Sequence, residues 1–88
     1  MLSYENLISK GFCLNEYKGE GKFYELVETN EQKIENILKV AGIDYDPECM
    51  DNKVILQLKE DFSNKLICVG CDVWDLSDYD FEKILEVM

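Results

Sequence analysis

The spacing of apolar residues changes between two periods along this chain, and that change constrains the fold most. In the segment 32–41, apolar residues recur at the i, i+3, i+4 and i+7 positions of one helix face, namely Ile34, Ile37, Leu38 and Ala41. In the segment 53–59, Val54, Leu56 and Leu58 instead alternate with other residues, as in a half-buried strand. A chain that contains both periods is expected to belong to the α+β class.

Capping residues mark the starts of three predicted helices. Ser3 precedes a short N-terminal helix. Thr29 and Gln32 form a capping box for the middle helix, and Gly42 is placed to end it. Ser77 is the expected cap of a C-terminal helix, in which the same apolar spacing recurs at Phe81, Ile84, Leu85 and Met88.

Two hairpins are predicted between these helices. The first pairs residues 12–17 with 22–27 across a turn with two glycines, which supply the positive φ that tight turns need. The second pairs residues 53–59 with 66–74. We therefore expect a small single domain, residues 1–88, in the order α-β-β-α-β-β-α, with a four-stranded, mainly antiparallel sheet and helices packed on one face. The residues expected in its core are Ile34, Ile37, Leu38, Val54, Leu56, Leu58, Val69, Phe81, Ile84 and Leu85.

The charged residues are strongly unbalanced. Nineteen acids face nine cations, all of them lysine, and the net charge is −10 with no arginine and no histidine. Histidine is the usual general base near neutral pH, and arginine is the usual clamp for phosphate and carboxylate. The charge argues against direct binding to nucleic acid or to an anionic membrane, and it favours a basic protein partner.

The sequence also lacks signals for a membrane or for secretion. No apolar run approaches the roughly 18 residues that a membrane span needs. The N-terminus has no basic region followed by an apolar stretch, so no signal peptide is expected. We therefore expect a cytoplasmic protein with no membrane contact.

Four cysteines allow a zinc hypothesis. Cys68 and Cys71 have the CxxC spacing, and Cys13 and Cys49 would complete a four-cysteine site. However, neither of the latter two belongs to a second CxxC, and on a continuous strand over 66–74 the first pair would point to opposite faces. Free cysteine in such a chain is usually a small buried apolar residue, so we expect no metal and no cofactor, with zinc or redox use as the alternatives.

The usual catalytic motifs are also missing. The acidic loop 44–51 does not fit a calcium-binding EF-hand, because Cys49 and Ile55 stand where that loop needs its glycine and its bidentate glutamate. The chain has no phosphate-binding glycine loop, no nucleophile elbow and no Ser–His or Cys–His pairing. We therefore expect that the protein is not an enzyme.

A row of acids near the C-terminus is the strongest candidate for a binding surface. The acidic stripe consists of Asp75, Asp78, Glu82 and Glu86, which share one helix face if the helix begins early enough to include the first. Lys83 is the only nearby cation expected to offset these acids, and Trp74 and Tyr79 are interleaved aromatics of the kind enriched at interfaces. A solvated charged face is the alternative. We expect that neutralising the stripe leaves the fold intact or slightly more stable. A second candidate region contains Asp44, Tyr45, Asp46 and Glu48.

These features predict a small, non-enzymatic, protein-binding inhibitor that occupies a basic, nucleic-acid-binding surface of its partner. In composition alone the chain resembles phage-encoded inhibitors of host-defence nucleases, including anti-CRISPR and anti-restriction proteins. Three alternatives remain: an immunity protein or antitoxin that neutralises a basic toxin enzyme, a small zinc protein using the four cysteines, and a structural subunit of a larger assembly.

Overall fold

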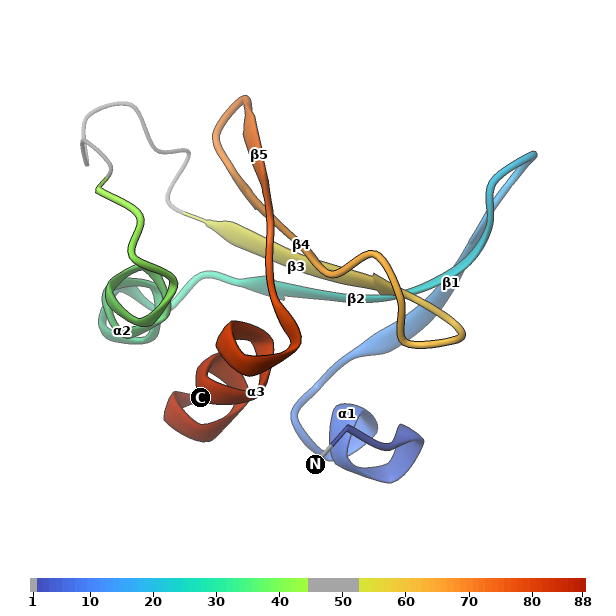
Figure 1. Cartoon of the computed structure of the whole chain (residues 1–88), viewed down its shortest axis with the longest axis horizontal. Helices are drawn as coiled ribbons and strands as arrows, with labels where there is room; N and C mark the ends of the chain where they lie inside the picture. Colours follow the sequence, from blue (N-terminus) through green and yellow to red (C-terminus); the bar gives the residue numbers. More distant parts are fainter. Residues whose placement is uncertain (1, 45–52) are drawn as a thin grey trace.

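The chain folds as a small α+β domain with three helices and a five-stranded antiparallel sheet (Figure 1). The structure is a computed structural model that describes residues 2–44 and 53–88. Its elements are α1 (Tyr4–Ser9), β1 (Cys13–Tyr17), β2 (Gly21–Glu28), α2 (Glu31–Ala41), β3 (Val54–Lys59), β4 (Leu66–Val69), β5 (Asp72–Asp75) and α3 (Asp78–Val87).

The sheet has five strands where four were predicted. The predicted strand 66–74 is a hairpin, in which β4 and β5 are joined at Gly70 and Cys71 and Val69 pairs with Asp72. Gly70 has φ 61°, the left-handed conformation that two-residue hairpin turns need. The turn was missed because apolar residues continue through both strands, so the period of two does not visibly break.

The strands lie in chain order, β1-β2-β3-β4-β5, and every neighbouring pair is antiparallel. The predicted first hairpin is confirmed as β1 and β2. Strands β2 and β3 pair side by side from Phe23 opposite Lys59 to Glu28 opposite Val54, although α2 lies between them in the sequence. The chain therefore leaves the sheet to form α2 and returns antiparallel to the strand it left.

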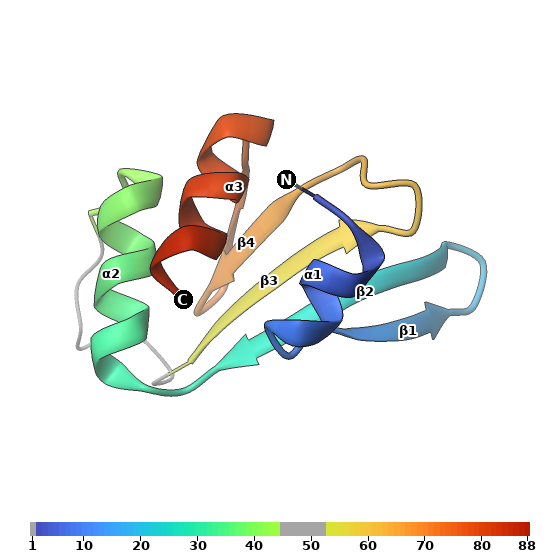
Figure 2. The ribbon, with the colours of Figure 1, turned by 90° about the horizontal axis from the view of Figure 1, so that it is seen from below.

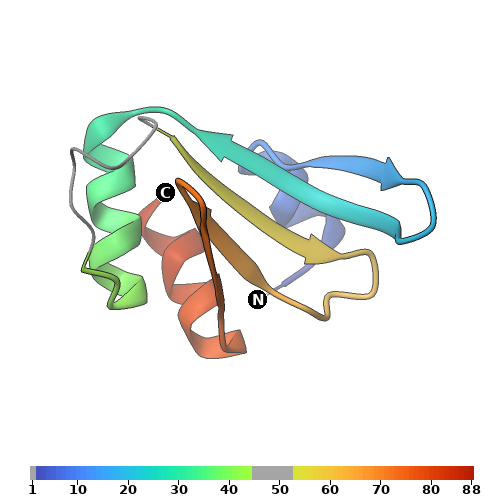
Figure 3. The ribbon, with the colours of Figure 1, turned by 90° about the horizontal axis from the view of Figure 1, so that it is seen from above.

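All three helices cover the same face of the sheet, as predicted (Figures 2 and 3). The ten residues expected in the core are all buried. The core cluster also includes residues that the periodicity did not single out, namely Leu7, Phe12, Tyr24 and Ile67. The core therefore lies between the helices and one side of the sheet, and the other side is left uncovered.

The helix ends are set by local hydrogen bonds. The hydroxyl of Ser77 accepts a hydrogen bond from the backbone N–H of Asp80, which confirms the predicted cap of α3. The cap of α2 is Asn30 and not Thr29, because the Asn30 side chain accepts from the N–H of Lys33 at 3.1 Å. Asn is at least as good a cap as Thr and stands one residue later, so the predicted capping box is wrong by one position.

Within the described residues, no helix is long and apolar enough to cross a membrane. The longest, α2, has 11 residues, and a span needs about 20.

Candidate protein-binding surfaces

Helix α3 carries most of the predicted acidic stripe, but not all of it. The helix begins at Asp78 and is capped by Ser77, so Asp75 lies on strand β5 and does not share the helix face. Asp78, Glu82 and Glu86 remain at i, i+4 and i+8 on one side of α3. The stripe is therefore three helical carboxylates, with Asp75 exposed on the neighbouring edge strand.

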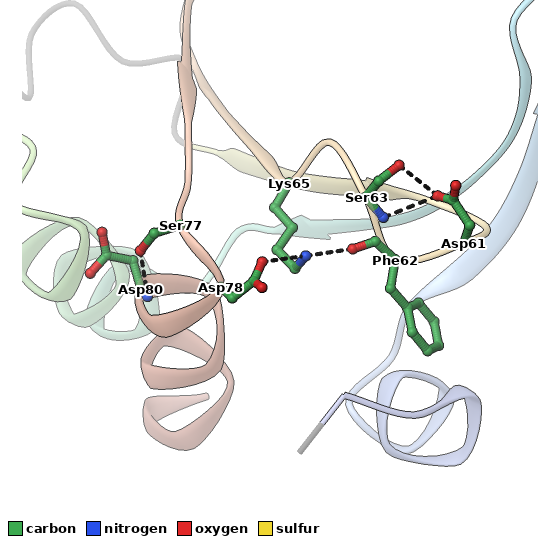
Figure 4. A network of polar contacts seen from close by, with 7 residues as sticks. All are labelled: Asp61, Phe62, Ser63, Lys65, Ser77, Asp78 and Asp80. Atoms are coloured by element: carbon green, nitrogen blue, oxygen red, sulfur yellow. Dashed lines mark hydrogen bonds and ion pairs between the residues drawn. The ribbon is translucent and has the colours of Figure 1, made fainter.

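Asp78 has a structural partner that the sequence did not suggest. Among the described residues, Lys65 is the one charged side chain that is buried, with 8% of its surface exposed. Its ammonium group donates to the backbone carbonyl of Phe62 and lies 2.7 Å from a carboxylate oxygen of Asp78 (Figure 4). The expectation that Lys83 alone would offset the stripe is therefore wrong, because Lys65 reaches its first residue from another part of the chain.

The other two carboxylates of the stripe border a shallow groove between α1 and α3. The groove has a volume of about 140 Å³ and is lined by Asn6, Lys10, Glu82, Leu85 and Glu86. Glu86 also lies 3.6 Å from Lys83, and its side chain is 67% exposed. Pairs at this distance and exposure contribute little to stability, so Glu86 remains available to a partner.

The two predicted aromatic residues have different environments. Tyr79 is 68% exposed, and the ammonium group of Lys83 lies 5.5 Å from its ring centre. Trp74 is half-buried on β5 and packs against the core cluster. By register Trp74 is paired with buried Ile67, so it lies on the helix-covered side of the sheet. Tyr79 is thus the exposed aromatic residue beside the acids.

The second predicted region is only partly described. Asp44 is exposed two residues after the left-handed Gly42 that ends α2. Tyr45, Asp46 and Glu48 lie outside the described residues.

The cysteines do not share one site in the described part of the chain. Cys13 is exposed on β1, Cys68 is half-buried on β4, and Cys71 is exposed in the β4–β5 turn, while Cys49 lies outside the described residues. The prediction that Cys68 and Cys71 lie on one strand and point to opposite faces is wrong, because β4 ends before Cys71 and a turn follows. Burial, with a smaller contribution from the negative charge of Glu25, raises the pKa of the Cys68 thiol. In residues 2–44 and 53–88, no three Cys, Asp or Glu side chains are grouped closely enough to hold a metal ion.

The uncovered side of the sheet carries a polar cluster that sequence reasoning missed. The Tyr17 hydroxyl donates to Oε2 of Glu25, and the Gln57 amide donates to the same oxygen at 3.1 Å. The hydrogen bond to Glu25, followed by burial, raises the pKa of Tyr17. Beside them Phe23 is covered by Tyr17, with ring centres 5.6 Å apart, and by Lys59, whose ammonium group is 6.0 Å from the ring centre. Only the cross-strand register, which the sequence does not show, brings these residues together.

An apolar row crosses the same side of the sheet. The register pairs Val27 with Ile55, Ile55 with Cys68, and Cys68 with Val73, so the four lie side by side on β2 to β5. Val27 is 49% exposed and Val73 is 58% exposed. Figure 3 looks onto this side, which no helix covers.

The domain thus has two candidate binding surfaces: the outer side of α3 and the uncovered side of the sheet. Comparisons with protein-family models, curated proteins and solved structures found no match for this chain. Its function is therefore inferred from geometry and charge.

Proposed function

We propose that this protein is a non-enzymatic inhibitor that binds a basic surface of another protein through the outer side of α3. The observation that carries the proposal is the combination on α3 of four carboxylates, one lysine and the 68%-exposed ring of Tyr79. Tyrosine is enriched among the residues that contribute most of the binding free energy at protein interfaces, and surrounding charges form the polar rim.

The charge distribution over the helices supports α3 as the contact. Helix α2 carries two glutamates and two lysines, so its charges balance. Helix α3 carries Asp78, Asp80, Glu82 and Glu86 against Lys83 alone. A concentrated field of one sign accelerates encounter with an oppositely charged surface, and it places the partner's cations next to α3 rather than α2.

The contact set follows from exposure and from the partners of each carboxylate. Glu86 is held only weakly by Lys83, and Glu82 borders the α1–α3 groove. Asp78 has one oxygen bound to Lys65, but its side chain is 86% exposed. With Tyr79 on the same helix, these carboxylates of α3 can occupy sites on the partner that otherwise hold phosphates.

The α1–α3 groove favours protein binding over small-molecule chemistry. Ligand pockets usually enclose about 300–1,000 Å³. The groove has about 140 Å³ and is lined mainly by charged or amide side chains. It suits a single basic side chain of a partner better than a substrate.

Two partner classes fit this surface. A nucleic-acid-binding nuclease or complex fits inhibition of the phage anti-defence or anti-CRISPR type, and a basic toxin enzyme fits an immunity protein or antitoxin. Both classes would use the same electrostatic contact, so binding data alone do not separate them. Identification of the captured partner does.

The experiment is capture of the partner from the source cell on immobilised wild-type protein, followed by affinity measurements with variants. Tyr79→Ala should weaken binding about thirtyfold or more if Tyr79 is an anchor residue. Glu82→Gln with Glu86→Gln should weaken it further at low salt. Asp78 is left unchanged because it binds buried Lys65.

The matched control for the double variant is Glu31→Gln with Glu35→Gln, which removes two exposed carboxylates from α2 and so makes the same change in net charge. If the α3 variants bind the captured partner as tightly as the control variant does, α3 is only a solvated face. If the partner is acidic or is nucleic acid itself, the proposal is wrong as a whole.

A further inference from the structure

We infer that the uncovered side of the sheet is a second docking surface, and that its occupant is a basic amphipathic helix of the partner. The inference rests on the proposed function in one respect, namely that the partner is basic. It adds a contact on the side of the molecule opposite α3, with a defined pattern of apolar and charged positions.

The pattern consists of two parallel rows across strands β2 to β5. The apolar row is Val27, Ile55, Cys68 and Val73. The acidic row lies next to it and is Glu25, Gln57, Leu66 and Asp75, with a carboxylate at each end. Each row places one residue on each of four neighbouring strands, so the two rows run across the strand direction together.

The dimensions of the rows fit a helix. Neighbouring strands lie about 4.8 Å apart, so Glu25 and Asp75, three strands apart, are separated by about 14 Å. That distance equals about nine residues of an α-helix, or two to three turns. A helix that lies across the strands can therefore place apolar side chains on the apolar row and two basic side chains at the ends of the acidic row.

Glu25 is prepared to accept a charged donor. Tyr17 and Gln57 both donate to its Oε2, which fixes the carboxylate and leaves Oε1 as an acceptor. Because the side chain is already ordered, a partner's lysine or arginine gains the charge-assisted hydrogen bond at little further entropic cost.

The positions of the lysines on this side of the sheet also favour a basic occupant. Lys59 lies over Phe23, outside the two rows, and Lys53 precedes β3 beyond the apolar row. The rows themselves contain two carboxylates and no cation. A second copy of this chain, with a net charge of −10, would meet those carboxylates with its own and is disfavoured.

The shape of the sheet agrees with an elongated occupant. The β1–β2 and β4–β5 hairpins both bend away from the helices, toward the uncovered side (Figure 1). The rows run from β2 across β3 to the β4–β5 hairpin, and the apolar side chains at the two ends of the apolar row, Val27 and Val73, remain about half exposed. Contiguous exposed apolar side chains with a polar rim are typical of interaction sites.

The test uses a synthetic amphipathic peptide of leucine and lysine, with its leucines at helical spacing, and a control peptide in which glutamate replaces lysine. Backbone amide NMR shifts of the full chain locate the contact. The lysine peptide should shift the amides of β2 to β5, and the glutamate peptide should not bind. Glu25→Gln should raise the Kd by about fivefold, as should Val73→Ser, while the control variant Glu35→Gln should not.

The amide spectrum of each unbound variant establishes that it is folded, and all three positions are at least partly exposed. If the lysine peptide shifts only α3 amides and its Kd is unchanged by Glu25→Gln, the sheet surface is not a docking site, while the proposed function of α3 stands. If the lysine peptide binds nowhere, the basic-partner proposal fails and this inference fails with it. Equal binding of the glutamate peptide would show that the acidic row selects nothing, and would overturn the inference alone.

Discussion

Replacement of Asp78 by Asn should destabilise the fold, although Asp78 is an exposed surface residue. Its carboxylate lies 2.7 Å from the ammonium group of Lys65, whose side chain is 7% exposed. After the substitution the buried ammonium group keeps the Phe62 carbonyl as its acceptor but loses its counter-charge. The same lysine also fixes the 60–65 loop, where Phe62 has a φ of 67° that non-glycine residues rarely adopt.

The size of the effect follows from the unequal burial of the two partners. Exposed ion pairs contribute about 0.2–1 kcal/mol, whereas removing one partner of a buried pair costs about 3–5 kcal/mol. Here one partner is buried and the other is 86% exposed, so water can still reach the pair. We expect a loss of about 1–2 kcal/mol in the free energy of unfolding, and a fall in Tm of about 5–15 °C for a domain of this size.

The assay is urea unfolding followed by far-UV circular dichroism, with Glu86→Gln as the control for removing an acid from α3. The control should change the free energy of unfolding by less than about 0.5 kcal/mol, because its pair with Lys83 is long and exposed. The double variant Lys65→Met with Asp78→Asn should recover part of the loss, because it no longer buries an unpaired charge. Equal stability of Asp78→Asn and wild type would refute the reasoning and restore the sequence-based expectation that neutralising the stripe is harmless.

Three further predictions concern the core, the pH dependence and metal. Leu56→Ala should cost about 2–5 kcal/mol in denaturant unfolding, because Leu56 is fully buried in the central strand; a loss below about 0.5 kcal/mol would contradict its place in the core. The pKa of Tyr17 is raised above its ordinary value of 10.0, so its contribution to stability is complete below that pH and is lost as the pH rises through the folded-state pKa. As the pH is raised above 10, the free energy of unfolding of a Tyr17→Phe variant, measured with denaturant at each pH, should therefore fall less than that of wild type. Equal decreases would show that Tyr17 does not cause the alkaline loss of stability. Purified protein should contain well under one zinc ion per chain by elemental analysis, since in the described residues no three Cys, Asp or Glu side chains are grouped closely enough to hold a metal ion; stoichiometric zinc with unfolding by chelator would reverse this.

The fold was predictable from the sequence where the apolar residues of a segment repeat with a single spacing, either helical or alternating. Helix α2 and strand β3 have clear apolar spacings, and their core residues were identified correctly. The β4–β5 hairpin was missed because 66–74 is apolar on both sides of Gly70, and a single glycine inside an apolar run also fits a bulge. The extra strand then placed Asp75 on the sheet instead of on α3.

The candidate surfaces were less predictable, because they depend on contacts between distant residues. The Lys65–Asp78 pair joins the loop before β4 to the start of α3. The contact of Glu25 with Gln57 joins residues 32 positions apart in the sequence. The alternation within each strand indicates which side of the sheet a residue lies on, but only the register between strands indicates its neighbours.

The salt dependence of the association rate constant with the captured partner tests the central claim most directly. For wild type the rate constant should fall steeply as ionic strength rises, because carboxylates of α3 steer the encounter. The double variant Glu82→Gln with Glu86→Gln should associate more slowly at low salt and show a flatter dependence, while the charge-matched control Glu31→Gln with Glu35→Gln should follow wild type more closely. Identical salt dependences for wild type and the α3 double variant would contradict the claim that α3 contacts a basic partner.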